Sequence, residues 1–94
     1  MQIVGRKVVH ELAAKHADVR EAVNVWLCEA EEAAWKKPTD IKSMYPHASI
    51  LSRNRVIFNL KGNRYRLEVK ISYQTGVVLI KRAGTHAEYS RWDT

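Results

Sequence analysis

The residues best suited to chemistry lie near the end of the chain, in the segment GTHAEYSRW. His86 and Tyr89 are three residues apart, so they lie on one face if this segment is helical. Histidine titrates near neutral pH, and a tyrosine hydroxyl can transfer protons when nearby cations lower its pKa. The pair suits metal-independent RNA cleavage, in which a base takes the proton of a 2′-hydroxyl and an acid protonates the leaving 5′-oxygen. A histidine alone is more often a surface or structural residue, so His86 depends on its neighbours for a catalytic role.

Basic side chains earlier in the chain could hold the phosphates that such a reaction needs. Arg64 and Arg66 are two residues apart on one expected strand, a separation of about 7 Å. Successive phosphates of a nucleic-acid strand have a similar spacing, roughly 6–7 Å. Lys61, in the preceding turn, and Lys81 and Arg82, on the next strand, would extend the patch. The alternative is a solvated outer face, where Lys and Arg are common.

The overall charge also indicates an anionic partner. Lys and Arg number 16 against 10 Asp and Glu, which gives a net charge of +6. Residues 1–54 contribute +1 and residues 55–94 contribute +5, so the excess is concentrated in the second part of the chain. Such clustering favours nucleic acid as the partner, although a basic protein without a nucleic-acid ligand has a similar composition.

Other classes of site lack the residues that they need. The single cysteine, Cys28, provides neither a disulfide framework nor a cysteine-rich zinc site. His10 and His16 are six apart, a poor spacing for shared ligation, and His47 stands alone. The chain has no H-E-x-x-H motif, glycine-rich phosphate loop or nucleophile elbow. We therefore expect no metal and no cofactor. The absence of a membrane span or signal peptide predicts a cytoplasmic protein with no membrane partner.

The first part of the chain predicts helices, in a single domain that spans residues 1–94. Residues 6–16 carry apolar side chains at helical spacing, and a longer helix is expected from Asp18 to Trp35. Asp18 and Glu21 resemble a capping box at its start. Lys36 and Lys37 would lie at its end, with Pro38 stopping it. A short helical turn is expected over residues 39–44.

From residue 55 the apolar period changes from 3.6 to 2, which predicts strands. Residues 55–60 and 64–73 alternate apolar and polar side chains, with a tight turn at 61–63 between them. A second turn at 74–76 leads into a strand over 77–84, and residues 1–5 could form a short additional strand. The fold class is therefore α+β, with N-terminal helices packed on a small antiparallel β-sheet.

Two motifs together resemble a known family. FNLKGNRYRL is followed about twenty residues later by GTHAEY, and the chain also contains W-x-K-P-x-D-I-K at 35–42 and Tyr45-Pro46. This combination resembles the HigB branch of the RelE-like toxin superfamily. The resemblance implies a RelE-like fold and a ribosome-dependent mRNA endonuclease that inhibits translation in the A site. It also implies a helix-turn-helix antitoxin of the HigA type as partner.

The resemblance implies roles for some residues. Arg66 matches an arginine used on the scissile phosphate, and Tyr89 matches a tyrosine that takes part in 2′-hydroxyl activation or base stacking. His86 and Lys61 align with basic positions that vary across the superfamily. The alternative to cleavage is an RNA- or ribosome-binding module that blocks translation without cutting. His86 and Tyr89 close to Arg66 would favour cleavage, whereas a separation above about 10 Å would favour the blocking module. An inactive member kept as an antitoxin partner or operon co-repressor is a third alternative.

Overall fold

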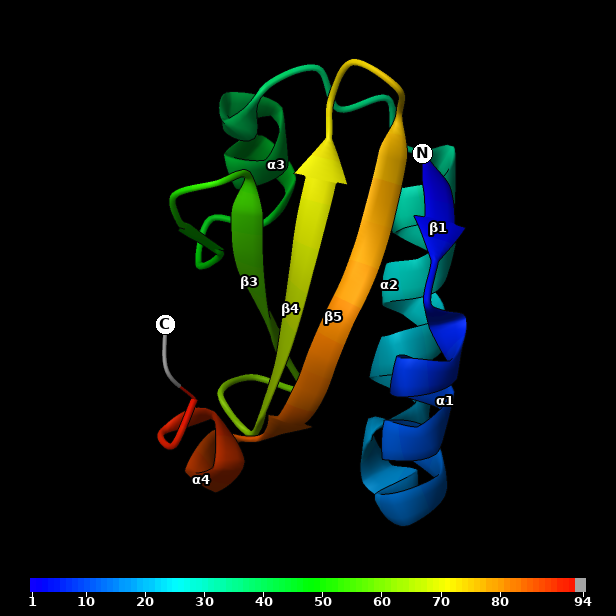
Figure 1. Cartoon of the computed structure of the whole chain (residues 1–94). Helices are drawn as coiled ribbons and strands as arrows, with labels where there is room; N and C mark the ends of the chain where they lie inside the picture. Colours follow the sequence, from blue (N-terminus) through cyan, green and yellow to red (C-terminus); the bar gives the residue numbers. More distant parts are fainter. Residues whose placement is uncertain (93–94) are drawn as a thin grey trace.

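The computed structural model, which describes residues 1–92, packs its two longest helices against one face of a five-stranded sheet (Figure 1). The strands lie in the order β1-β5-β4-β3-β2. The elements, in chain order, are β1 (Gln2–Val4), α1 (Arg6–Lys15), the 3-10 turn η1 (Ala17–Val19), α2 (Arg20–Glu32), α3 (Pro38–Met44), β2 (Ser49–Ile50), β3 (Arg55–Leu60), β4 (Tyr65–Ser72), β5 (Val77–Thr85) and α4 (His86–Tyr89). The expected α+β class is confirmed. No helix in this described part is long and apolar enough to cross a membrane.

The sheet is mixed rather than purely antiparallel, which corrects one expectation. β3, β4 and β5 form the predicted antiparallel meander, because two tight turns connect them. β2 adds to the β3 edge, also antiparallel. β1, however, pairs with β5 in parallel, with Gln2 opposite Val77 and Val4 opposite Leu79. No turn joins β1 to β5, so the local sequence does not specify their relative direction.

The core lies between the sheet and helices α1 and α2, and the period-2 pattern explains its composition. The alternate apolar residues of β3 and β4 are almost completely buried: Val56, Phe58, Leu60, Leu67, Val69 and Ile71. An aromatic cluster fills the region around Phe58, whose ring centroid lies 5.3 Å from that of Trp26 and 5.0 Å from that of Tyr45. The polar residues of the same strands consequently face away from the helices, onto the opposite surface of the sheet.

Asp18 does not cap a helix, contrary to the capping-box expectation. It lies in η1, and α2 begins two residues later without a side-chain cap. Its Oδ1 atom accepts a hydrogen bond of 2.6 Å from the hydroxyl of Tyr65, and Arg64 lies 3.7 Å from its Oδ2 atom. The carboxylate therefore connects the helical layer to the start of β4 instead of satisfying the backbone of α2.

The Tyr65–Asp18 bond predicts a pH-dependent contribution to stability. The hydrogen bond from Tyr65 lowers the pKa of Asp18 below 3.8 and raises the pKa of Tyr65 above 10.0. The contribution is therefore present above pH 3.8 and lost as the pH falls through the folded-state pKa of Asp18. At the other limit, it is present below pH 10.0 and lost as the pH rises through the pKa of Tyr65. We therefore expect the urea midpoint of unfolding to fall less steeply at acid pH in Tyr65→Phe than in the wild type.

Tyr73→Phe is a matched control for that measurement. The Tyr73 hydroxyl is buried without a hydrogen-bond partner within residues 1–92. Its removal should therefore leave the urea midpoint with the same dependence on acid pH as in the wild type. If the urea midpoint depended on acid pH equally in the wild type and in Tyr65→Phe, the Tyr65–Asp18 bond would not be the source of this pH dependence.

The long helix is also shorter than its apolar pattern indicated. α2 ends at Glu32, because Ala33 is already extended with ψ of 154°. Pro38 does not stop this helix; it occupies the first turn of α3, where a missing N–H is tolerated. The backbone N–H groups of Lys36 and Lys37 donate to Asp40 Oδ2, so these residues lead into α3.

Candidate functional site

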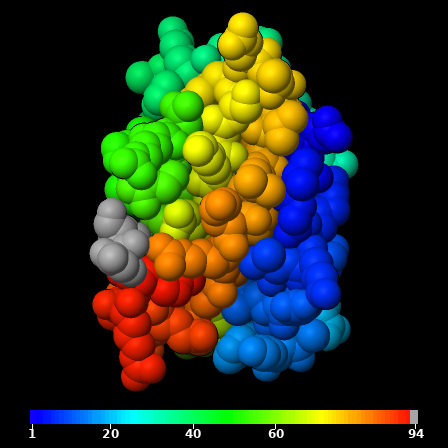
Figure 2. All heavy atoms as spheres, viewed as in Figure 1, coloured from blue at the N-terminus to red at the C-terminus, as the bar shows by residue number. Residues whose placement is uncertain are grey.

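The end of β5 turns directly into α4, which lies beside the lower end of that strand on the surface of the molecule (Figure 2). Thr85 caps α4: its Oγ1 atom accepts from the N–H of Glu88 at 3.1 Å, and Glu88 Oε1 accepts from the N–H of Thr85 at 2.9 Å. Gly84 permits this close turn, because a Cβ atom there would lie only 3.2 Å from Glu88 Cβ. The N–H of His86 donates to the carbonyl oxygen of Arg64 at 2.8 Å, which holds the helix start against the β3–β4 turn.

Three residues that the sequence singled out for catalysis lie together at this junction. The Cζ atom of Arg66 lies 5.1 Å from the ring centroid of Tyr89, a cation–π distance. The ring centroids of Tyr89 and His86 are 6.4 Å apart, since α4 places them on neighbouring positions. Arg66 is itself held by a 2.9 Å hydrogen bond from Nη1 to the carbonyl oxygen of Asn63. Tyr89 therefore lies between the Arg66 guanidinium and the His86 ring, and its own distance from Arg66 is below the limit of about 10 Å.

The polar face around Arg66 is largely buried, unlike the solvated outer face that was the alternative to a phosphate-binding patch. Arg66 is 8% exposed and Glu68 only 4% exposed. Arg82 donates from Nε to Glu68 Oε1 at 2.7 Å, and its Cζ atom lies 4.5 Å from the centroid of Trp92. Trp92 in turn lies 5.4 Å from Tyr89. Tyr89 of α4 therefore lies over Arg66, and Trp92, which follows α4, lies over Arg82. The buried Glu68 carboxylate pairs with Arg82 and lies 4.0 Å from Arg55 Nη1.

A bulge in β5 is responsible for the position of Arg82. Glu68 pairs with Arg82 and Val69 pairs with Ile80, so Lys81 is an extra residue without a partner in β4. Without the bulge, Lys81 would lie opposite Glu68. Bulges often redirect side chains next to functional sites, and this one brings Arg82 onto the face of Arg66. Lys81 remains exposed.

Arg64 and Lys61 do not join Arg66, which corrects the expectation that Arg64 and Arg66 share a strand face. Arg64 lies in the turn before β4, and its guanidinium points to Asp18 on the helical side of the molecule. Lys61 has a positive φ of 51° in the same turn, and its charge is one of the causes that lower the pKa of Asp18. The expected basic patch is therefore divided into two groups.

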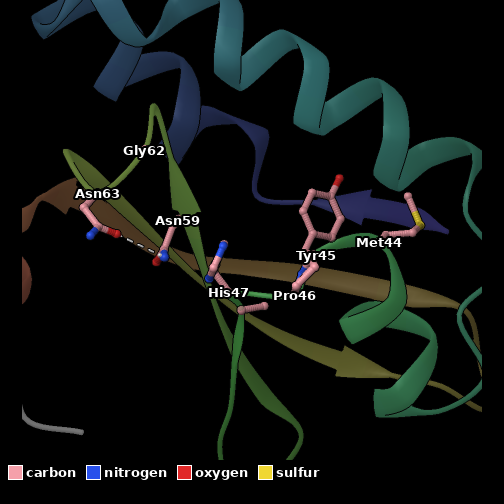
Figure 3. A pocket seen from close by; sticks show the side chains of 8 residues that line it. Met44, Tyr45, Pro46, His47, Asn59, Gly62 and Asn63 are labelled. Atoms are coloured by element: carbon pink, nitrogen blue, oxygen red, sulfur yellow. Dashed lines mark hydrogen bonds between the residues drawn. The ribbon is translucent and has the colours of Figure 1, made fainter.

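A pocket of about 440 Å³ adjoins the site and was missed by the sequence analysis (Figure 3). It lies between the loop that follows α3 and the β3–β4 turn. Its lining residues are Met44, Tyr45, Pro46, His47, Ala48, Asn59, Gly62 and Asn63. Asn59 is the cross-strand neighbour of Arg66, and Asn63 holds the Arg66 guanidinium. Its sequence signals were Asn59, a polar residue on the outer face of β3, and Asn63 in the turn.

Potential metal ligands do not gather in the part of the chain that the structure describes. No group of three or more His, Cys, Asp and Glu side chains in residues 1–92 is arranged to hold a metal ion. The protonatable ring in contact with Arg66 is instead that of Tyr89, which in turn lies beside the His86 ring. The site therefore consists of one buried guanidinium, the aromatic side chains of α4 and an uncharged pocket beside them.

The chain matches a known protein family over most of its length. A family model for HigB toxins, described as the RelE-like toxic component of a toxin–antitoxin system, matches residues 19–92. The match includes both β4, with Arg66, and α4, with His86 and Tyr89. No curated protein matches the chain.

Proposed function

The chain belongs to the HigB family of RelE-like toxins from toxin–antitoxin systems, and we propose that it is an endoribonuclease that cuts mRNA on the ribosome. The observation that carries the proposal is the contact of the Arg66 guanidinium with the Tyr89 ring, which in turn contacts His86. A phosphate-binding cation and two proton-transferring side chains are what cleavage through a 2′-hydroxyl needs.

In the proposed reaction, the 2′-oxygen of one nucleotide attacks the adjacent phosphorus. A base removes the 2′-proton, the bond from phosphorus to the 5′-oxygen breaks, and an acid protonates that leaving oxygen. The products are a cyclic 2′,3′-phosphate and a free 5′-hydroxyl. Arg66 stabilises the negative charge that develops on the phosphoryl oxygens, while Tyr89 and His86 share the two proton transfers.

The basic residues around this centre differ in what they can offer to RNA. Arg82 is already paired with Glu68 and covered by Trp92, so we propose that it positions the floor of the site. Lys81 is exposed nearby on β5 and is available to the RNA backbone. Arg64 and Lys61 lie near Asp18, and we assign them to more distant phosphates of the same strand.

The ribosome is proposed to supply the substrate geometry. The described site has two proton-transferring side chains and one well-placed arginine, so it depends on an mRNA that is already held in a reactive conformation. We therefore expect message in the ribosomal A site to be cut much faster than free RNA. The antitoxin of this toxin–antitoxin system is proposed to be a helix-turn-helix protein of the HigA type, and the toxin to act in the cytoplasm.

Replacement of His86 tests the proton-transfer role. We expect His86→Ala to lower cleavage of ribosome-bound message by about 100-fold, the range typical of general acid–base catalysis. Primer extension on a short message after induction measures the cuts directly. Tyr89→Phe complements it, because the ring remains over Arg66 while the hydroxyl is lost.

His10→Ala is the matched control, since His10 is an exposed histidine in α1. It should cut as the wild type does. Cleavage by His86→Ala within a few-fold of wild type would remove His86 from the mechanism. An intact message in growth-arrested cells that express the wild type would instead identify a translation inhibitor that does not cut.

A further inference from the structure

The pocket beside Arg66 is placed where part of a bound nucleotide would lie. Asn59 is opposite Arg66 in the β3–β4 ladder, and the carbonyl oxygen of Asn63 accepts from Arg66 Nη1 at 2.9 Å. The pocket wall is therefore in direct contact with the guanidinium proposed to hold the phosphate. A base attached to a nucleotide at that phosphate lies within reach of the pocket.

The lining of the pocket suits a base better than a phosphate. None of its eight lining residues is Lys, Arg, Asp or Glu. Met44, Tyr45, Pro46 and Ala48 provide apolar surface, while His47 and the two asparagines provide polar groups. Figure 3 shows the asparagines at one end of the pocket, Met44 at the other, and His47 between them. A flat, uncharged group with one polar edge matches this distribution, and single-stranded bases stack on rings such as that of His47.

The two asparagines offer a defined hydrogen-bonding pattern. Asn59 Nδ2 donates to Asn63 Oδ1 at 3.3 Å, and this bond uses one group from each amide. One carbonyl oxygen and one amino group then remain, without another side-chain partner within residues 1–92. If the oxygen and nitrogen atoms of the Asn59 and Asn63 amides are both exchanged, one carbonyl oxygen and one amino group still remain. Base edges combine adjacent donors and acceptors, and asparagine is one of the side chains that recognise them.

We propose that this pocket binds one unstacked base of the message next to the cut phosphate, and that Asn59 and Asn63 determine which base is preferred there. The inference rests on the proposed endonuclease function and extends it to sequence preference. His47 lies along the base as a stacking surface, and the apolar residues form the floor beneath it.

The test is to map cut sites across many messages in cells expressing wild type, Asn59→Ala, Asn63→Ala or Asn24→Ala. Asn24 is an exposed asparagine of α2, so its variant is a matched control. Base frequencies are counted at each position around the cuts, which makes the readout independent of total activity. We expect the preference at one position to fall about tenfold in both pocket variants. Preferences elsewhere, and in Asn24→Ala, should match wild type.

Other outcomes overturn the inference. Unchanged preferences in both pocket variants would show that the pocket does not recognise a base. A change spread over several positions, or complete loss of cuts in both variants, would assign the asparagines to the geometry of Arg66 instead. A wild type that makes no cuts would contradict the proposed function itself, so the two failures are distinguishable.

Discussion

Arg66→Ala is expected to lower message cleavage by about 100- to 1000-fold, the loss typical when one charge-stabilising group is removed from an active site. Arg66 is the buried guanidinium at the centre of the site, and Tyr89 lies directly over it. Its hydrogen bond to the backbone of Asn63 fixes its direction before RNA binds. Preorganisation of this kind makes the charge effective without reorganisation during the reaction.

Arg66→Lys separates charge from shape. Lysine keeps the positive charge but lacks the planar fork, so it should recover only part of the activity. Arg20→Ala, at an exposed position in α2, is the control and should cut as wild type does. Primer extension gives the cleavage rates, and thermal melting shows whether each variant is folded. A folded Arg66→Ala protein that cuts within tenfold of wild type would exclude Arg66 from the reaction.

Phe58→Ala is expected to reduce the free energy of unfolding by about 3–5 kcal/mol. Phe58 is completely buried in β3, and its ring contacts those of Trp26, Trp35 and Tyr45. Removing the ring would leave a cavity among three large aromatic side chains that cannot collapse into it. A domain of this size has roughly 5–15 kcal/mol in total, so much of its stability would be lost.

Urea denaturation followed by tryptophan fluorescence measures this effect, since Trp26 and Trp35 both contact Phe58. Phe58→Leu should cost less, because it retains much of the apolar volume. Leu79→Ala is the control: Leu79 is 36% exposed on β5, and its loss should cost less than about 1 kcal/mol. Similar losses for Phe58→Ala and Leu79→Ala would show that the aromatic cluster does not dominate stability.

Local sequence patterns predicted most of the fold. Alternation in β3 and β4 assigned the buried face correctly, and the turns between strands specified an antiparallel meander. The errors arose where distant residues compete with local signals. Asp18 forms a hydrogen bond with Tyr65, 47 positions away, instead of capping α2. The parallel pairing of β1 with β5 likewise has no local signature.

In the candidate site, too, the features set by local sequence were predicted and those set by distant residues were not. His86 and Tyr89 could be placed together because their spacing and a helical turn suffice. Their contact with Arg66 depends on the path of α4 over the sheet, which Gly84 permits but does not specify. The burial of Arg66 and Glu68 was not predictable from a pattern that marks both as outward-facing. The bulge at Lys81 was also invisible, since a strand with one extra residue still alternates on either side of it.

The pairing of β1 with β5 also has a consequence for the order of folding. Gln2 and Val77 are 75 positions apart, so the edge strand must close a very large loop before it gains a strand partner. The hairpins of the meander form from near neighbours and need no such closure. During synthesis β1 therefore leaves the ribosome first and must wait for its partner. The junction between β5 and α4, where we propose the catalytic site, is completed later still, so a partly made chain has no finished site with which to cut the message that is being translated.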